Sequence, residues 1–111
     1  MVDFTIKKND NSPAIAGILS DFNGVVNLTT ATKVNFFMEK KKTGRRKVNG
    51  VASITDVNGG GVSYAWQTGD TNESGLFKAV FKVTFSSGQI ATFPSDGYIE
   101  ISIQRPITNF P

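Results

Sequence analysis

The sequence predicts an all-β fold, and more specifically an antiparallel immunoglobulin-like β-sandwich of about seven to nine short strands. Three observations indicate this fold. Apolar and polar residues alternate in short runs, turn residues separate these runs at intervals of about 8–12 positions, and no apolar pattern of helical period continues for ten residues. A small barrel is the alternative. The length of 111 residues predicts a single domain over residues 1–111.

The first part of the chain predicts three short extended segments. Apolar residues alternate over residues 2–6 and give way to a polar turn. Pro13 opens a second strand over residues 14–20, and the Asn-Gly pair at residues 23–24 is a strong turn signal. Residues 25–28 are then short and extended.

The middle of the chain predicts two strands joined by a basic loop. Residues 28–32 fit either a single helical turn or a crossing between sheets. Apolar alternation predicts strands over residues 34–38 and 48–55. The loop between them, residues 40–47, carries Gly44 at its tip.

The strongest strand signal covers residues 76–85. Five residues fall on one side of this strand at a period of two: Phe77, Ala79, Phe81, Val83 and Phe85. Residues 62–66 alternate in the same way before it, and residues 99–103 after it, with Gly, Asp and Ser at both joints. We therefore expect three or four successive antiparallel strands. Residues 104–111 contain two prolines and predict an extended tail outside any sheet interior.

The composition excludes several kinds of chemistry. The chain has no cysteine and no histidine, so it lacks a thiolate nucleophile, a disulfide, the commonest general base and the commonest transition-metal ligand. No acidic or hydroxyl pair has a recognisable catalytic spacing. We expect a protein without enzyme activity, cofactor or metal. The first residues do not form a signal peptide and no apolar run is long enough to span a membrane, which predicts synthesis and folding in the cytoplasm.

Positive charge is concentrated in the basic loop. It holds six of the 12 basic residues: Lys40, Lys41, Lys42, Arg45, Arg46 and Lys47. The remaining six are outnumbered by nine acidic residues. Such a loop can contact an acidic partner, or it can be a solvated hairpin that keeps a sheet edge soluble. Nucleic acid is the less favoured partner, because the loop has no aromatic side chain to stack on bases.

Several apolar residues are expected outside the core. Neighbouring residues of a strand face opposite sides, so Phe37 points outward if Phe36 belongs to the core. The same phase places Leu76 and Val80 on the outside of the main strand. Together with Ile107 and Phe110 of the tail, these are candidate partner-binding residues. An outward Phe37 is either covered by another segment of the chain or part of an interface.

Three further features have simpler structural interpretations. Trp66 is in phase with the apolar residues of its strand and is expected in the core. Asp70, Asn72 and Glu73 offer too few oxygen ligands for a calcium site and instead fit a self-capped turn. The glycines at residues 59–61 lack the Gly-Lys-Ser/Thr ending of a phosphate-binding loop, so we expect a flexible hairpin turn.

The second half also carries a series of motifs in a fixed order. They are Trp66, Gly69-Asp70-Thr71, Gly75, the aromatic strand at residues 77–85, Ser87-Gly88, Phe93-Pro94 and Asp96-Gly97-Tyr98, followed by alternating isoleucines. This series resembles the N-terminal domain of phage baseplate upper proteins, and the first half agrees with that family more loosely. The resemblance implies an immunoglobulin-like module in the virion that docks on other virion subunits.

From these observations we expect a phage virion structural protein: a head decoration or cement protein, or a neck, tail or baseplate component. Its partners would be other virion proteins and further copies of itself in a symmetric assembly. One alternative is a host-surface or carbohydrate-binding module, for which Phe37, Phe22 and Tyr98 are candidate exposed aromatics. A second alternative is a small nucleic-acid-binding protein that uses residues 40–47.

Overall fold

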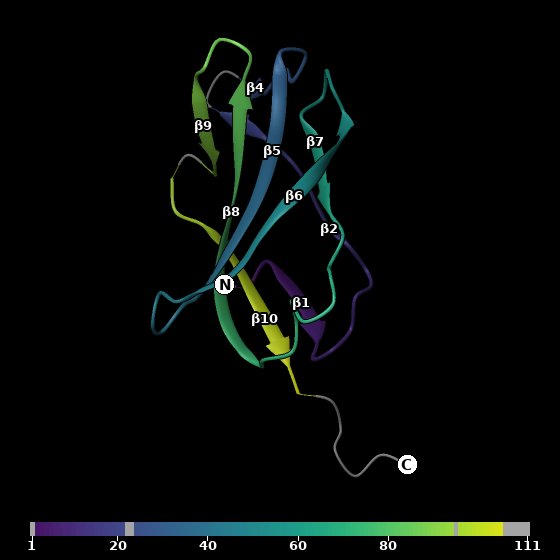
Figure 1. Cartoon of the computed structure of the whole chain (residues 1–111), viewed down its shortest axis with the longest axis vertical. Helices are drawn as coiled ribbons and strands as arrows, with labels where there is room; N and C mark the ends of the chain where they lie inside the picture. Colours follow the sequence, from purple (N-terminus) through teal and green to yellow (C-terminus); the bar gives the residue numbers. More distant parts are fainter. Residues whose placement is uncertain (1, 22–23, 95, 106–111) are drawn as a thin grey trace.

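Three long strands form the frame of the molecule (Figure 1). They are β5 (Ala31–Lys40), β6 (Arg46–Asp56) and β8 (Gly75–Phe85). The computed structural model describes residues 2–21, 24–94 and 96–105 and, within them, contains no helix. The all-β prediction is therefore confirmed for the described residues.

Seven shorter strands complete the structure. They are β1 (Phe4–Lys7), β2 (Ile15–Ile18), β3 (Ser20–Asp21), β4 (Gly24–Val25), β7 (Gly61–Tyr64), β9 (Ile90–Phe93) and β10 (Ile99–Gln104). The predicted strand over residues 14–20 is divided at Leu19 into β2 and β3. Strands β3 and β4 pair with each other in antiparallel fashion. Asn23 of the expected Asn-Gly turn lies outside the described residues. Residues 28–32 form a turn, in which the amide of Ala31 donates to the carbonyl oxygen of Leu28 at 3.0 Å, and then enter β5.

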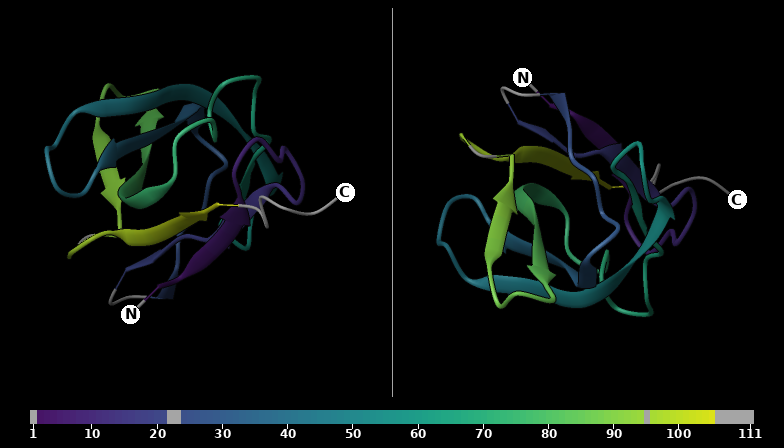
Figure 2. Two further views of the ribbon diagram at one scale, coloured as in Figure 1. Left: turned by 90° about the horizontal axis from the view of Figure 1, so that it is seen from below. Right: turned by 90° about the horizontal axis from the view of Figure 1, so that it is seen from above.

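The main sheet has the order β1-β10-β8-β5-β6-β7-β2, and β9 pairs with β8 alongside β10. Strand β6 pairs with β5 over its first part and with β7 near its end. It therefore carries the sheet over into a second layer, and the views along the long axis show strands on both sides of the core (Figure 2).

The strand at residues 62–66 was expected to neighbour the main strand, but β7 pairs with β6 and β2 instead. The expectation of an entirely antiparallel sheet is also wrong, because β1 pairs with β10 in parallel. These pairings depend on residues far apart in the sequence, which local alternation does not reveal.

Within the part of the chain that the structure describes, no hydrogen-bonded pairing joins the two ends of this sheet, β1 and β2. The opening is a hollow of about 310 Å3, lined by Phe4 of β1, by Ile15 to Ile18 of β2, and by Phe81 and Phe93 beneath them. The architecture is thus a two-layered sheet that curls toward a barrel and stays open at one seam. Among the described residues, no helix has the length and apolar character needed to cross a membrane.

The core follows the predicted alternation of the main strand. Phe77, Ala79, Phe81 and Val83 of β8 are buried, whereas Phe85 is only partly buried. They pack with the predicted core set of β5, which is Val34, Phe36 and Met38. The Phe36 ring lies 4.7 Å from that of Tyr64, 5.1 Å from Phe81 and 5.6 Å from Trp66 between centroids. Trp66 is buried, as predicted.

Candidate interaction surface

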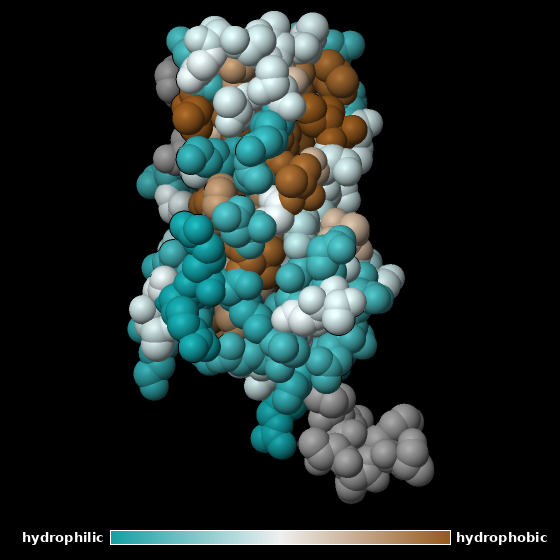
Figure 3. All heavy atoms as spheres, in the orientation of Figure 1, coloured by the Kyte–Doolittle hydropathy of each residue, from teal (hydrophilic) through white to brown (hydrophobic). Residues whose placement is uncertain are grey.

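The outer face of β5, β6 and β8 carries side chains that alternate with those of the core. Phe37 of β5 and Val80 of β8 are directly opposite each other in the sheet. Both are partly buried, and Leu76 is 44% exposed. The predicted outward orientation of these three residues is confirmed. Figure 3 shows this side of the molecule, where apolar surface is visible between hydrophilic side chains.

Phe37 lies between two cations. The guanidinium carbon of Arg46 is 5.4 Å from the centre of the Phe37 ring, and the ammonium nitrogen of Lys82 is 5.9 Å from it. Cation–π contacts at exposed sites contribute about 0.5–1 kcal/mol each. The neighbouring strands therefore hold the ring in place, while part of it stays open to solvent.

A second aromatic ring, Tyr98, has the same kind of environment. It is 41% exposed. The ammonium nitrogens of Lys78 and Lys41 lie 5.4 Å and 5.8 Å from its centre. Tyr98 was only a minor candidate from the sequence, and Lys78 and Lys82 were not candidates at all. The register of β10 and β8, in which Glu100 pairs with Lys78, brings Tyr98 next to Lys78 on this face.

A hollow of about 250 Å3 lies on this face. Its walls include both aromatic rings, and it is lined by Phe37, Met38, Glu39, Arg46, Lys78, Ala79, Val80 and Tyr98. We call this group the Phe37–Tyr98 hollow. It combines exposed apolar surface with three cations on its walls and rim: Arg46, Lys78 and, beside Phe37, Lys82. These are the properties of a protein–protein or ligand contact site.

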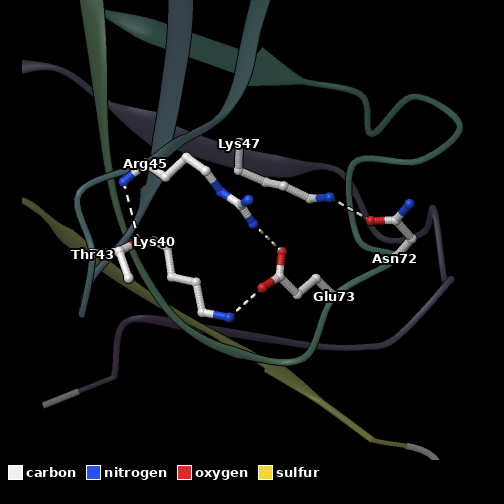
Figure 4. Close-up of polar contacts among 6 residues, drawn as sticks. All are labelled: Lys40, Thr43, Arg45, Lys47, Asn72 and Glu73. Atoms are coloured by element: carbon white, nitrogen blue, oxygen red, sulfur yellow. Dashed lines mark hydrogen bonds and ion pairs between the residues drawn. The ribbon is translucent and has the colours of Figure 1, made fainter.

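The predicted basic loop is shorter than expected, because Lys40 belongs to β5 and Arg46 and Lys47 belong to β6. Much of its charge contacts the same chain (Figure 4). Lys40 forms an ion pair with Glu73, Arg45 Nη2 lies 3.4 Å from Glu73 Oε1, and Lys47 donates a hydrogen bond to Asn72. Asn72 and Glu73 thus supply the polar surface that opposes the loop.

Lys41 and Lys42, at the start of the loop, differ in their contacts. Lys41 Nζ lies 2.6 Å from Glu100 Oε2, and the Lys41 amide donates to the carbonyl oxygen of Leu76 at 3.0 Å. Lys42 is exposed and forms no ion pair with the residues that the structure describes. Four of the six cations, Lys40, Lys41, Arg45 and Lys47, are thus engaged within the chain. The loop as a whole is therefore not the free basic patch that one alternative required.

These contacts shift the pKa values of Glu73, Glu100 and Lys41. The hydrogen bond from Lys40 holds the pKa of Glu73 below its usual value of 4.5. The hydrogen bond from Lys41 does the same for the pKa of Glu100, and Glu100 in turn raises the pKa of Lys41 above 10.5. A positive charge beside a carboxyl group favours its ionised form.

We therefore expect the protein to lose stability in acid. A carboxyl group whose pKa is lowered by folding contributes stability above its unfolded pKa, and this contribution is lost as the pH falls through the folded value. The melting temperature should fall as the pH decreases below about 4.5. The Glu73→Gln/Glu100→Gln double variant should melt at a lower temperature at pH 7 and show a flatter acid profile. An unchanged profile would contradict the role of these two ion pairs.

The residues considered for a metal site have other contacts. Asp70 Oδ2 accepts hydrogen bonds from the Tyr64 hydroxyl at 2.5 Å and from the Gln67 amide at 2.8 Å. Burial, and then this contact, raise the pKa of Tyr64. Asn72 and Glu73 face the basic loop. Within the described ranges, no group of three or more acidic side chains could hold a metal ion. Ile107 and Phe110 lie outside the described residues, so their predicted contacts stay predictions.

Comparisons with known proteins give a structural likeness only. No family model matches the sequence, and a search of curated proteins finds no match. Among solved structures, the crystal structure of CopC from Methylosinus trichosporium OB3b matches with a TM-score of 0.53. The alignment covers 99% of this chain and 91% of CopC, with 12% identical residues. The likeness supports a β-sandwich-like fold and carries no argument about function.

Proposed function

We propose that this chain is a non-enzymatic structural protein of a phage virion. In this proposal it is an immunoglobulin-like module that docks on neighbouring virion subunits, as a head decoration protein or as a neck, tail or baseplate component. The observation that carries the proposal is the Phe37–Tyr98 hollow, a partly exposed aromatic and cationic site on the rigid face of the main sheet. The motif series from Trp66 to the isoleucines of β10 supplies the link to phage virions.

The position of the hollow favours docking. Interfaces of proteins are enriched in aromatic residues and Arg, and their strongest contacts are aromatic or Arg side chains that become fully desolvated. Phe37 and Tyr98 are such side chains, and Arg46 lies against one of them. Because β5 and β8 are paired along most of their length, the site needs little ordering before it binds.

The proposal is tested by attachment to phage particles that lack the protein. Phe37→Ala should reduce the affinity for such particles by about tenfold or more, because it removes a central aromatic contact. Val25→Ala is the matched control, since Val25 is 56% exposed on β4, away from the hollow. Both variants should remain folded, although Phe37→Ala should lose about 1–2 kcal/mol of stability with its two cation–π contacts. Full attachment of the Phe37→Ala protein would contradict the proposal.

One observation favours a second candidate, the binding of single-stranded nucleic acid. The basic loop lacks aromatic residues, but the fold places Phe37 and Tyr98 next to Lys41, Arg46, Lys78 and Lys82. Cations next to stacking rings are what such binders use. Tight binding of a 12-mer of thymidine by the isolated protein, lost in Phe37→Ala, would support this candidate over docking.

A further inference from the structure

The two rings of the Phe37–Tyr98 hollow differ in the charge around them. Both cations at Tyr98 also contact a carboxylate: Lys41 pairs with Glu100 at 2.6 Å, and Lys78 pairs with Glu39 at 3.5 Å. Arg46 and Lys82, the two cations at Phe37, form no ion pair with any described residue. The uncompensated positive charge is therefore confined to the Phe37 end of the hollow.

The rest of the hollow is lined by apolar side chains, by Lys78 and by one carboxylate, Glu39. Val80 lies opposite Phe37 in the sheet, and Tyr98 forms the far wall. Glu39, whose side chain is 45% exposed, is the cross-strand neighbour of both Arg46 and Lys78. A single anionic group thus fits beside Phe37, where Arg46 and Lys82 would complement it. A second anionic group placed next to Lys78 would approach Glu39, which pairs with Lys78 at 3.5 Å and opposes such a group. The space between the rings is large enough for one apolar side chain of a partner.

We propose that the hollow binds an acidic, extended segment of a partner protein. A carboxylate of that segment lies between Arg46 and Lys82, and a neighbouring apolar side chain packs against Val80 and Tyr98. This inference rests on the proposed docking function and names the chemistry of the partner. Because the two cations bind the carboxylate on one side and the apolar contact lies on the other, they also fix the direction in which the segment lies.

The same charge pattern disfavours nucleic acid. A single strand carries a phosphate at every nucleotide, so its charges repeat along the whole binding face. Of the four cations at the two rings, only Arg46 and Lys82 form no ion pair with a described residue, and Glu39 lies between Arg46 and Lys78 in the sheet, where it interrupts the positive charge. An acidic segment with one apolar residue matches this arrangement better than a uniform polyanion.

The test uses three synthetic peptides and the intact protein. The peptide SDELDS should bind and should shift the nuclear magnetic resonance signals of Phe37, Val80 and Tyr98. The neutral peptide SNQLNS and the peptide SDESDS, which lacks the apolar side chain, should each bind about tenfold more weakly or worse. Binding of SDELDS should weaken as the salt concentration is raised, because the distance over which charges interact shortens to about 8 Å at 0.15 M ionic strength.

Protein variants identify the site. Arg46→Glu and Lys82→Glu should each abolish binding of SDELDS. Lys33→Glu makes the same change in net charge at an exposed position of β5 and should bind like the parent. Equal binding of SDELDS and SNQLNS, or equal effects of Lys33→Glu and Lys82→Glu, would overturn the inference. Tighter binding of the thymidine 12-mer than of SDELDS would overturn it in favour of nucleic acid.

The particle assay separates this inference from the proposed function. If Phe37→Ala prevents attachment but Arg46→Glu and Lys82→Glu attach normally, docking is supported and the acidic partner is wrong. If all three variants attach normally, the proposed function itself fails.

Discussion

Replacing Phe81 by alanine should lower the free energy of unfolding by about 3–5 kcal/mol, the usual cost of truncating a buried phenylalanine. Phe81 is 1% exposed, its ring centre lies 5.1 Å from that of Phe36, and it pairs across the sheet with both Phe36 and Phe93. The loss combines the transfer free energy of the removed atoms with the free-energy cost of the cavity that they leave. Because a domain of this size is stable by about 5–15 kcal/mol, the variant should be marginally folded.

Urea denaturation measures this effect, and Lys82→Ala provides the control. Lys82 is the next residue of the same strand and points outward, so its truncation removes only its contact with Phe37 and should lower the stability by no more than about 1 kcal/mol. Equal losses in the two variants would mean that the inner and outer faces of β8 have been exchanged in our description.

Gly60→Ala should be the second most damaging substitution. Gly60 has a φ of 72°, and its carbonyl oxygen accepts a hydrogen bond from the Leu19 amide at 2.8 Å. An added Cβ would lie 2.6 Å from the carbonyl oxygen of Leu19 and 3.0 Å from that of Val26. Both are backbone atoms that cannot rotate away. We expect a loss of about 2–5 kcal/mol, from the strained conformation and the overpacking together.

Gly88→Ala separates the two contributions. Gly88 has a φ of 90°, but a Cβ there would meet no atom within 4 Å. Its substitution should cost only the conformational strain, about 1–2 kcal/mol. If thermal unfolding shows equal losses for Gly60→Ala and Gly88→Ala, the close packing of Gly60 against the backbone of Leu19 and Val26 does not contribute to stability.

The local alternation of apolar and polar residues predicted the main strand and the directions in which its side chains point. A period of two identified β8 and its inward residues, and the same phase placed Phe37, Leu76 and Val80 outside. The pattern also placed Trp66 in the core. The sequence did not show that the turn at residues 58–61 is packed, because the contact of Gly60 is with residues far away along the chain.

The candidate site could be predicted only in part. Phe37 was found from its neighbour Phe36, but Tyr98, Lys78 and Lys82 come together through the register of β5, β8 and β10. The basic loop was recognised from composition alone. Its partners Glu73 and Glu100 lie 33 and 59 residues from Lys40 and Lys41, so no local signal indicates that they neutralise it.

A cryo-electron microscopy map of the phage particle tests the central claim most directly. The proposal predicts symmetric copies of this chain, in which Phe37, Val80 and Tyr98 are buried against a neighbouring subunit and a carboxylate of that subunit lies between Arg46 and Lys82. Copies whose Phe37–Tyr98 hollow faces solvent, or particles that contain no copy of the chain, would contradict it.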